Sequence, residues 1–74
     1  MATVAKVIEL VATSEKSFDD AVQRGLAVAS ETIRGITGLD VTNWTCSVKD
    51  NRIVAYKVTM NVAFAIERAT NKKK

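Results

Sequence analysis

The chain has 74 residues, 47% hydrophobic and 26% charged, with one cysteine, no histidine and no proline. This composition is typical of one globular domain; it excludes a disulfide framework within the chain, and the usual residues of zinc sites and nucleophile–base pairs are lacking. The net charge of +3 equals the contribution of Lys72, Lys73 and Lys74, because eight basic and eight acidic residues remain without them. We therefore expect no enzyme, no secretion signal and no membrane span, and a reducing, cytoplasmic location.

The first predicted element is a strand from Thr3 to Ala12. Its apolar residues are interrupted only by Lys6 and Glu9, so they fall on both faces of the strand. Such a run is typical of a strand that is at least partly covered on both sides.

A helix is predicted from Phe18 to Arg34. Ser17 can accept a hydrogen bond from the first free N–H groups, and the following acidic pair, Asp19 and Asp20, suits the positive end of the helix dipole. Apolar and small residues recur at three- and four-residue spacing and form one stripe: Phe18, Val22, Gly25, Leu26, Ala29, Ile33 and Ile36. The small members of the stripe allow the helix to approach a sheet closely, and Gly35 and Gly38 mark its end.

Two further strands are predicted, Leu39 to Lys49 and Ile53 to Ile66. In the second of these, every second residue from Val54 is apolar, the pattern of a strand with one buried face. The residues between the two strands, Asp50 and Asn51, suit a two-residue hairpin turn with positive φ at both positions. An uninterrupted ladder from that turn places Trp44 opposite Lys57 and on the same strand face as Gly38.

The element order is therefore β-α-β-β, an α+β fold in which a three-stranded antiparallel sheet wraps one helix. A right-handed crossover makes the first two strands parallel, with the third between them. The helix covers about 25 Å and the last strand roughly 43 Å, so part of the hairpin has no cover within the chain. We expect the uncovered part to pack against copies of the same chain.

From Ala5 to Glu67 the chain resembles the dodecins, small βαββ proteins that bind flavins and assemble into hollow spheres of twelve subunits. The resemblance rests on four segments: KVIELVATS, SFDDAV, ASETIRGI and VAYKVTMNVAF. It implies a single domain over residues 1–67, a homododecamer, and a non-catalytic storage or sequestration function. It also implies a flat ligand of the riboflavin or FMN class, bound between subunits.

The resemblance also assigns the ligand-binding positions, and this chain departs from the family at several of them. The stacking tryptophan of flavin-binding members corresponds to Gly38, and the glutamine that contacts the pyrimidine edge corresponds to Lys57. Basic residues of the family correspond to Thr45 and Ala65. Trp44 is the remaining candidate, either as a relocated stacking platform or as a subunit contact. Lys57 either binds an anionic group or pairs with a carboxylate at an interface.

An alternative function is a dodecin-like shell that does not bind flavin, and instead binds a metal cation such as calcium or acts as a scaffold. The candidate oxygen ligands are Glu9, Glu15, Asp40, Asp50 and Glu67, although surface charge balancing is the favoured interpretation of these residues. Cys46 is interpreted as a small apolar residue.

The segment 68–74 is predicted to be a basic, disordered tail. A third hypothesis, nucleic-acid binding through this tail, requires an affinity that depends steeply on salt and disappears when Lys72, Lys73 and Lys74 are deleted. We do not expect nucleic acid as a partner, because the rest of the chain is neutral.

Overall fold

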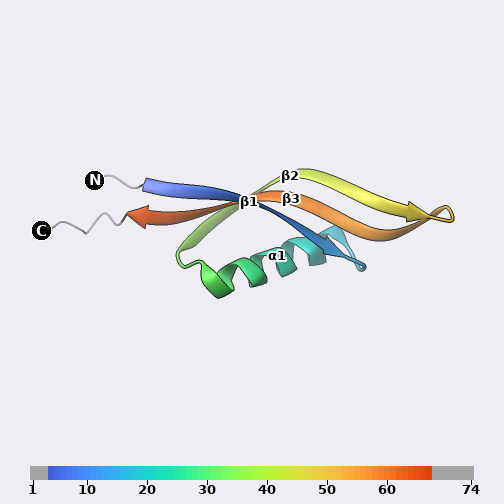
Figure 1. Cartoon of the computed structure of the whole chain (residues 1–74), viewed down its shortest axis with the longest axis horizontal. Helices are drawn as coiled ribbons and strands as arrows, with labels where there is room; N and C mark the ends of the chain where they lie inside the picture. The colour runs from blue at the N-terminus through green and yellow to red at the C-terminus, as the bar shows by residue number, and fades with distance from the viewer. Residues whose placement is uncertain (1–3, 68–74) are drawn as a thin grey trace, which may run out of the picture.

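The computed structural model describes residues 4–67, which form three strands and one helix (Figure 1). The elements are β1 (Val4–Ser14), α1 (Phe18–Thr32), β2 (Ile36–Lys49) and β3 (Arg52–Glu67). This is the βαββ arrangement predicted from the sequence. The expected tail at 68–74 lies outside the described residues.

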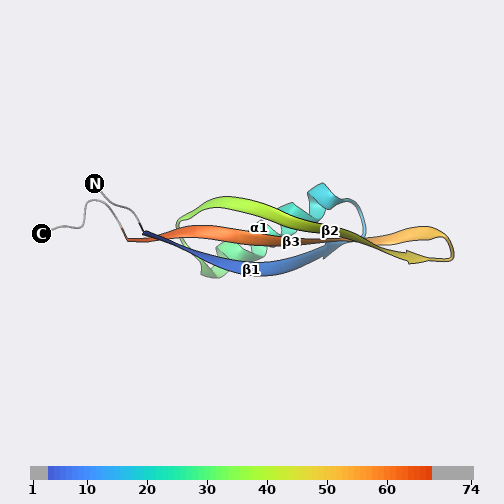
Figure 2. The same ribbon diagram turned by 90° about the horizontal axis from the view of Figure 1, so that it is seen from above.

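The sheet order is β1-β3-β2, with β3 antiparallel to both neighbours (Figure 2). The central position predicted for the last strand is therefore confirmed. In β1 the pairing is continuous from Ala5, except for one irregularity at Val4, and Leu10 lies opposite Met60. Because side chains alternate across a strand, every second residue of β1 and β3 points towards the helix.

The helix covers only the middle of the sheet, and the β2–β3 hairpin extends beyond its N-terminal end (Figure 1). The principal extents are 61 × 20 × 13 Å and the radius of gyration is 15.8 Å. A compact domain of this length has a radius of gyration of about 11 Å. The predicted overhang is therefore present, and the fold is markedly elongated.

The helix begins as its sequence predicts. Ser17 is the N-cap, and its Oγ accepts a hydrogen bond from the backbone N–H of Asp20 at 2.9 Å. The helix ends at Thr32, two residues before the predicted boundary, and Gly35 follows with φ of 76°. Positive φ is a conformation that glycine adopts without steric cost, so Gly35 allows the chain to turn back into β2.

Small residues on the helix allow it to lie close to the sheet. Ala21, Gly25 and Ala29 are the buried residues of α1. A Cβ atom added to Gly25 would overlap Cε of Met60 and would come within 3.2 Å of Cβ of Ala12. The core lies along β3, where Val58, Met60 and Val62 are fully buried. The part of the predicted stripe that lies within the helix therefore faces the sheet, with Ala21 as an additional member, whereas Ile33 is the C-cap and Ile36 is the first residue of β2.

The hairpin turn is confirmed, with φ of 53° at Asp50 and 63° at Asn51. Near the turn Lys49 lies opposite Arg52, and far from it Leu39 lies opposite Val62, as an uninterrupted ladder requires. From Asn43 to Ser47 the predicted register is wrong by one residue, whereas Asp40 and Val41 pair as predicted.

Two irregularities of opposite effect explain this shift. The ladder passes from Val41 directly to Asn43, which leaves Thr42 as an extra residue in β2. It returns to the original register between Ser47 and Val48, where β3 contains the extra residue Val54. A β-bulge of this kind reverses the faces of the residues that follow it, and a second bulge on the partner strand cancels the offset.

Threonine side chains satisfy backbone groups at the bulges of β2. Thr42 Oγ1 donates a hydrogen bond to the carbonyl oxygen of Thr59 at 3.2 Å. Thr37, the extra residue of a third irregularity between Ile36 and Gly38, donates in the same way to the carbonyl oxygen of Ala63 at 3.4 Å. Each hydroxyl thus compensates for part of the ladder that its bulge interrupts.

Candidate functional site

The face of the sheet directed away from α1, which we call the outer face, carries three of the four predicted ligand-binding residues. The register places Gly38 beside Ala63, and Thr45 beside Lys57, on this face. About six residues of β3, roughly 20 Å, separate the two pairs. Within one chain the outer face therefore brings Thr45 and Lys57 together and leaves Gly38 at a distance.

Trp44 is not part of this face, which corrects the prediction that it lies opposite Lys57. It pairs with Val58 and points towards the helix, where its ring meets Phe18 edge to face with centroids 5.0 Å apart. Phe18 makes a similar contact with Tyr56 at 5.1 Å. The physical reason is the bulge at Thr42, which moves Trp44 to the face opposite from Gly38.

The surroundings of Gly38 are open. A Cβ atom added to this glycine would meet no atom within 4 Å, so close packing within the chain does not require glycine here. A shallow cavity of about 250 Å³ lies at this position, lined by Val7, Gly38, Leu39, Asp40, Asn61 and Ala63. Glycine inside a strand often marks a place where a ligand or another backbone approaches closely.

Lys57 lies between two hydroxyl-bearing residues. Its neighbour in β1 is Thr13 and its neighbour in β2 is Thr45. Among the described residues, its ammonium group is in no salt bridge. The row combines a positive charge with two hydroxyl donors, which is suited to an anionic or hydrogen-bond-accepting group. Thr13 was not among the predicted site residues; it could be found only once the pairing of β1 with β3 was known.

A second row on the outer face carries carboxylate and amide oxygen atoms, and its two carboxylates are among the candidate cation ligands predicted from the sequence. Glu9 lies opposite Asn61, which lies opposite Asp40 on the other side. Of the other predicted cation ligands, Asp50 lies at the hairpin tip and Glu15 in the β1–α1 connection. The side chain of Glu67 lies outside what the structure describes. No group of three or more His, Cys, Asp or Glu side chains within the described range could hold a metal ion.

The remaining single residues make no further site. Ala65 lies in β3, where its backbone N–H donates to the carbonyl oxygen of Gly35 at 3.1 Å. Cys46 is exposed and lies opposite Tyr56, so the interpretation as a small apolar residue is not supported by burial.

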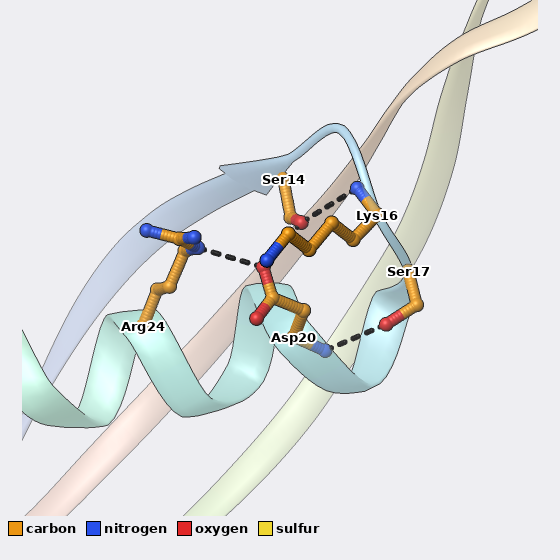
Figure 3. Close-up of polar contacts among 5 residues, drawn as sticks. All are labelled: Ser14, Lys16, Ser17, Asp20 and Arg24. Carbon is orange, nitrogen blue, oxygen red and sulfur yellow. Dashed lines mark hydrogen bonds and ion pairs between the residues drawn. The ribbon is translucent and has the colours of Figure 1, made fainter.

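A polar network joins the end of β1 to the first turn of α1 (Figure 3). Ser14 is 5% exposed; its Oγ donates to Asp20 Oδ2 at 2.5 Å and accepts from the backbone N–H of Lys16 at 2.9 Å. Arg24 Nε donates to the same carboxylate oxygen at 2.7 Å. This network was not predicted from the sequence, although the four-residue spacing of Asp20 and Arg24 is typical of a helical ion pair.

These contacts determine the ionisation of the two charged members. The hydrogen bond from Ser14, and after it the hydrogen bond from Arg24, lowers the pKa of the Asp20 carboxyl. The hydrogen bond to Asp20 raises the pKa of Arg24. Since both groups keep their charges at neutral pH, the network is not suited to proton transfer. Its hydrogen bonds instead hold the first turn of α1 against the end of β1.

Membrane crossing by a helix is not supported in residues 4–67, because α1 is neither long nor apolar enough.

Comparison with known proteins agrees with the fold and with the sequence motifs. The dodecin family model matches residues 4–67. A dodecin from Thermus thermophilus is 33% identical over 67 residues, which cover 90% of this chain and 97% of the relative. The solved structure of Streptomyces coelicolor dodecin has a TM-score of 0.84 at 27% identity and covers 90% of this chain and 96% of that chain.

A more distant structure shares the fold. The calcium dodecin of Mycobacterium tuberculosis is 23% identical, with a TM-score of 0.75 over 95% of this chain and 99% of that chain. The family match spans all the described residues, and the T. thermophilus relative aligns over almost its full length. This chain therefore belongs to the dodecin family.

Proposed function

We propose that the protein is a non-catalytic binding and storage protein of the cytoplasm, with residues 1–67 as its single domain. It holds a flat ligand of the riboflavin or FMN class against the outer face. The observation that carries this proposal is that Gly38, Thr45 and Lys57, the positions at which the resemblance implies ligand contacts, share that face.

A complete site requires more than one copy of the chain. Gly38 and Lys57 are roughly 20 Å apart along β3, farther than a single ring system can bridge. The elongated shape and the exposed apolar residues of the hairpin support packing against other copies; Val48 and Ile53 are 65% and 52% exposed. We propose a homododecamer in which the ligand lies between subunits.

The chemistry of the site differs from that implied by the family resemblance. Gly38 supplies no aromatic ring, so the ligand loses a stacking interaction worth roughly 1–3 kcal/mol per base-like ring. Lys57 supplies a positive charge where the resemblance implies a neutral amide, which favours a ligand with an anionic edge or a phosphate. The expected affinity for flavin is therefore modest, and higher for FMN than for riboflavin.

The test is a fluorescence titration of riboflavin and FMN with the purified protein and with the variant Gly38→Trp. Because a Cβ atom added at this position meets no atom of the same chain within 4 Å, we expect the side chain to be accommodated, and the variant should bind at least about tenfold more tightly. Gly38→Leu is the matched control, since it fills the same space without a ring. Absence of quenching by both the wild type and Gly38→Trp would contradict flavin binding.

The second candidate is a cation-binding shell, favoured by the Glu9–Asn61–Asp40 row. Its oxygen atoms are of the type that calcium prefers, although two carboxylates are fewer than most calcium sites use. Thermal unfolding with and without calcium distinguishes this candidate, because a ligand specific for the folded state raises the midpoint. The increase should disappear in Asp40→Asn and persist in Asp50→Asn.

A further inference from the structure

A groove runs between α1 and the edge strand β1. Its volume is about 500 Å³, and it is lined by Ile8, Leu10, Val11, Ala12, Thr13, Arg24, Gly25, Val28, Ala29, Thr32 and Ile33. Two of the valines that line it are largely exposed, Val11 at 57% and Val28 at 64%. From Arg24 to Thr32 the helix rises about 12 Å, so the groove is long and narrow.

One end of the groove is polar and the other is apolar. A second cavity of about 290 Å³ adjoins the polar end, because it shares Thr13 and Arg24 with the groove and is also lined by Ser14, Glu15 and Lys16. Towards the other end the lining is aliphatic apart from Thr32, with Ile8 and Ile33. An amphipathic ligand with one polar group and one aliphatic chain fits this distribution.

The guanidinium of Arg24 indicates the charge of the polar group. Its Nε atom donates a hydrogen bond to Asp20 Oδ2. Within residues 4–67, no side chain accepts a hydrogen bond from its two terminal nitrogens. Asp20 therefore holds the guanidinium in place, and Figure 3 shows one of its nitrogens directed away from Asp20. Two parallel N–H groups on an edge of a guanidinium match the two oxygens of a carboxylate.

Lys16 lies at the same end. Its side chain extends over Asp20 towards Arg24 (Figure 3). Glu15 lines the adjoining cavity and Asp20 pairs with Arg24, so these two carboxylates offset much of the charge of Lys16 and Arg24 and disfavour a dianionic phosphate relative to a singly charged carboxylate. We propose that this groove binds the anion of a medium-chain fatty acid, with the carboxylate at Arg24 and the aliphatic chain running past Val28 towards Ile33.

The site is separate from the one proposed for flavin. It lies between β1 and the helix and uses none of Gly38, Thr45 or Lys57, although Thr13, the β1 neighbour of Lys57, lines its polar end.

The test is isothermal titration calorimetry of the full chain with decanoate and with decanol, below the concentration at which decanoate self-associates. Decanoate should bind about tenfold more tightly than decanol, because only decanoate pairs with the guanidinium. Arg24→Gln should remove this difference by weakening decanoate alone. Lys16→Gln provides a second test of the charge that leaves the Asp20–Arg24 pair intact, and it should weaken decanoate by a smaller factor.

The aliphatic part of the groove has its own matched pair of variants. Val28→Asp places a charge in the groove and should weaken both probes by at least about tenfold. Ala27→Asp places the same charge at an exposed position of the same helix that does not line the groove, and it should leave both affinities unchanged. In ¹⁵N-labelled protein, amide shifts on adding decanoate should concentrate in residues 11–13 and 24–33.

Two results would overturn the proposal. One is equal binding of decanoate by the wild type and by Val28→Asp. The other is that the wild type binds neither probe while Val28→Asp reduces the assembly size in sedimentation, which would show that a second copy of the chain fills the groove.

Discussion

Trp44 packs edge to face against Phe18, with ring centroids 5.0 Å apart. This contact joins the half of β2 nearer the hairpin turn to the first turn of α1. The bulge at Thr42 makes this contact possible, because it directs Trp44 to the same face as the buried Val58. Without the bulge, the indole ring would lie on the outer face beside Lys57.

This geometry predicts energetic coupling between Trp44 and Phe18. A double-mutant cycle with Trp44→Leu and Phe18→Leu should give a coupling free energy of about 0.5–1.5 kcal/mol, measured by denaturant unfolding. The parallel cycle of Trp44→Leu with Lys57→Met is the control and should give a value near zero. A larger coupling in the second cycle than in the first would favour the uninterrupted register.

Two glycine-to-alanine substitutions should have opposite effects on stability. Gly25→Ala adds a methyl group that lies 3.2 Å from Cβ of Ala12 and displaces Cε of Met60, which is fully buried and has to repack within the core. Overpacking of about 1–3 kcal/mol should therefore exceed the gain in helix propensity of about 1 kcal/mol. Gly38→Ala enters open space and should stabilise the fold by about 0.4–1 kcal/mol. Chemical denaturation of both variants measures the difference, and stabilisation by Gly25→Ala would contradict the close packing of helix and sheet.

Stability should decrease in acid through Asp20. Its folded-state pKa lies below that of the unfolded chain, so the ionised carboxyl stabilises the fold fully above the unfolded value of about 3.9. That stabilisation is lost as the pH falls through the folded-state value. The difference in unfolding free energy between wild type and Asp20→Asn should therefore be largest at neutral pH and shrink below about pH 4.

Asp19→Asn is the control for this prediction, because Asp19 lies in the same helical turn but makes none of the hydrogen bonds of Asp20. Its smaller effect should come from the helix dipole alone. Equal pH profiles for the two variants would show that the network with Ser14 and Arg24 is not the cause.

The helix cap can be tested with two serines of one helix. Ser17→Ala removes the acceptor for the N–H of Asp20 and should cost about 1 kcal/mol. Ser30 instead donates to the carbonyl oxygen of Leu26 near the other end of the helix, so Ser30→Ala should be neutral or slightly stabilising. Thermal unfolding of the two variants compares them directly.

Much of the fold was predictable because local patterns agree with each other. The alternation in β3 gave its buried face, and Asp50 and Asn51 gave the turn. The small residues Gly25 and Ala29 indicated the close approach of the helix. These features depend on neighbouring residues only, which is why a single sequence was enough.

The register of β2 was not predicted correctly, although the sequence contains a signal for it. Leu39 and Val41 are apolar at odd positions, whereas Trp44, Cys46 and Val48 are apolar at even positions. The two consecutive polar residues at 42 and 43 mark the change of phase, and a bulge is the structure that accommodates it. The pairing of Thr13 with Lys57 could not be predicted in this way, because it depends on contact between strands more than forty residues apart.

The central place of β3 has a consequence for synthesis on the ribosome. Both β1 and β2 pair with β3 and not with each other, and β3 follows them in the chain. The first two strands therefore leave the exit tunnel without a partner, and no ladder of this sheet can form until β3 begins to emerge. During that interval the nascent chain should expose its apolar β1 segment, which makes early binding by a chaperone advantageous.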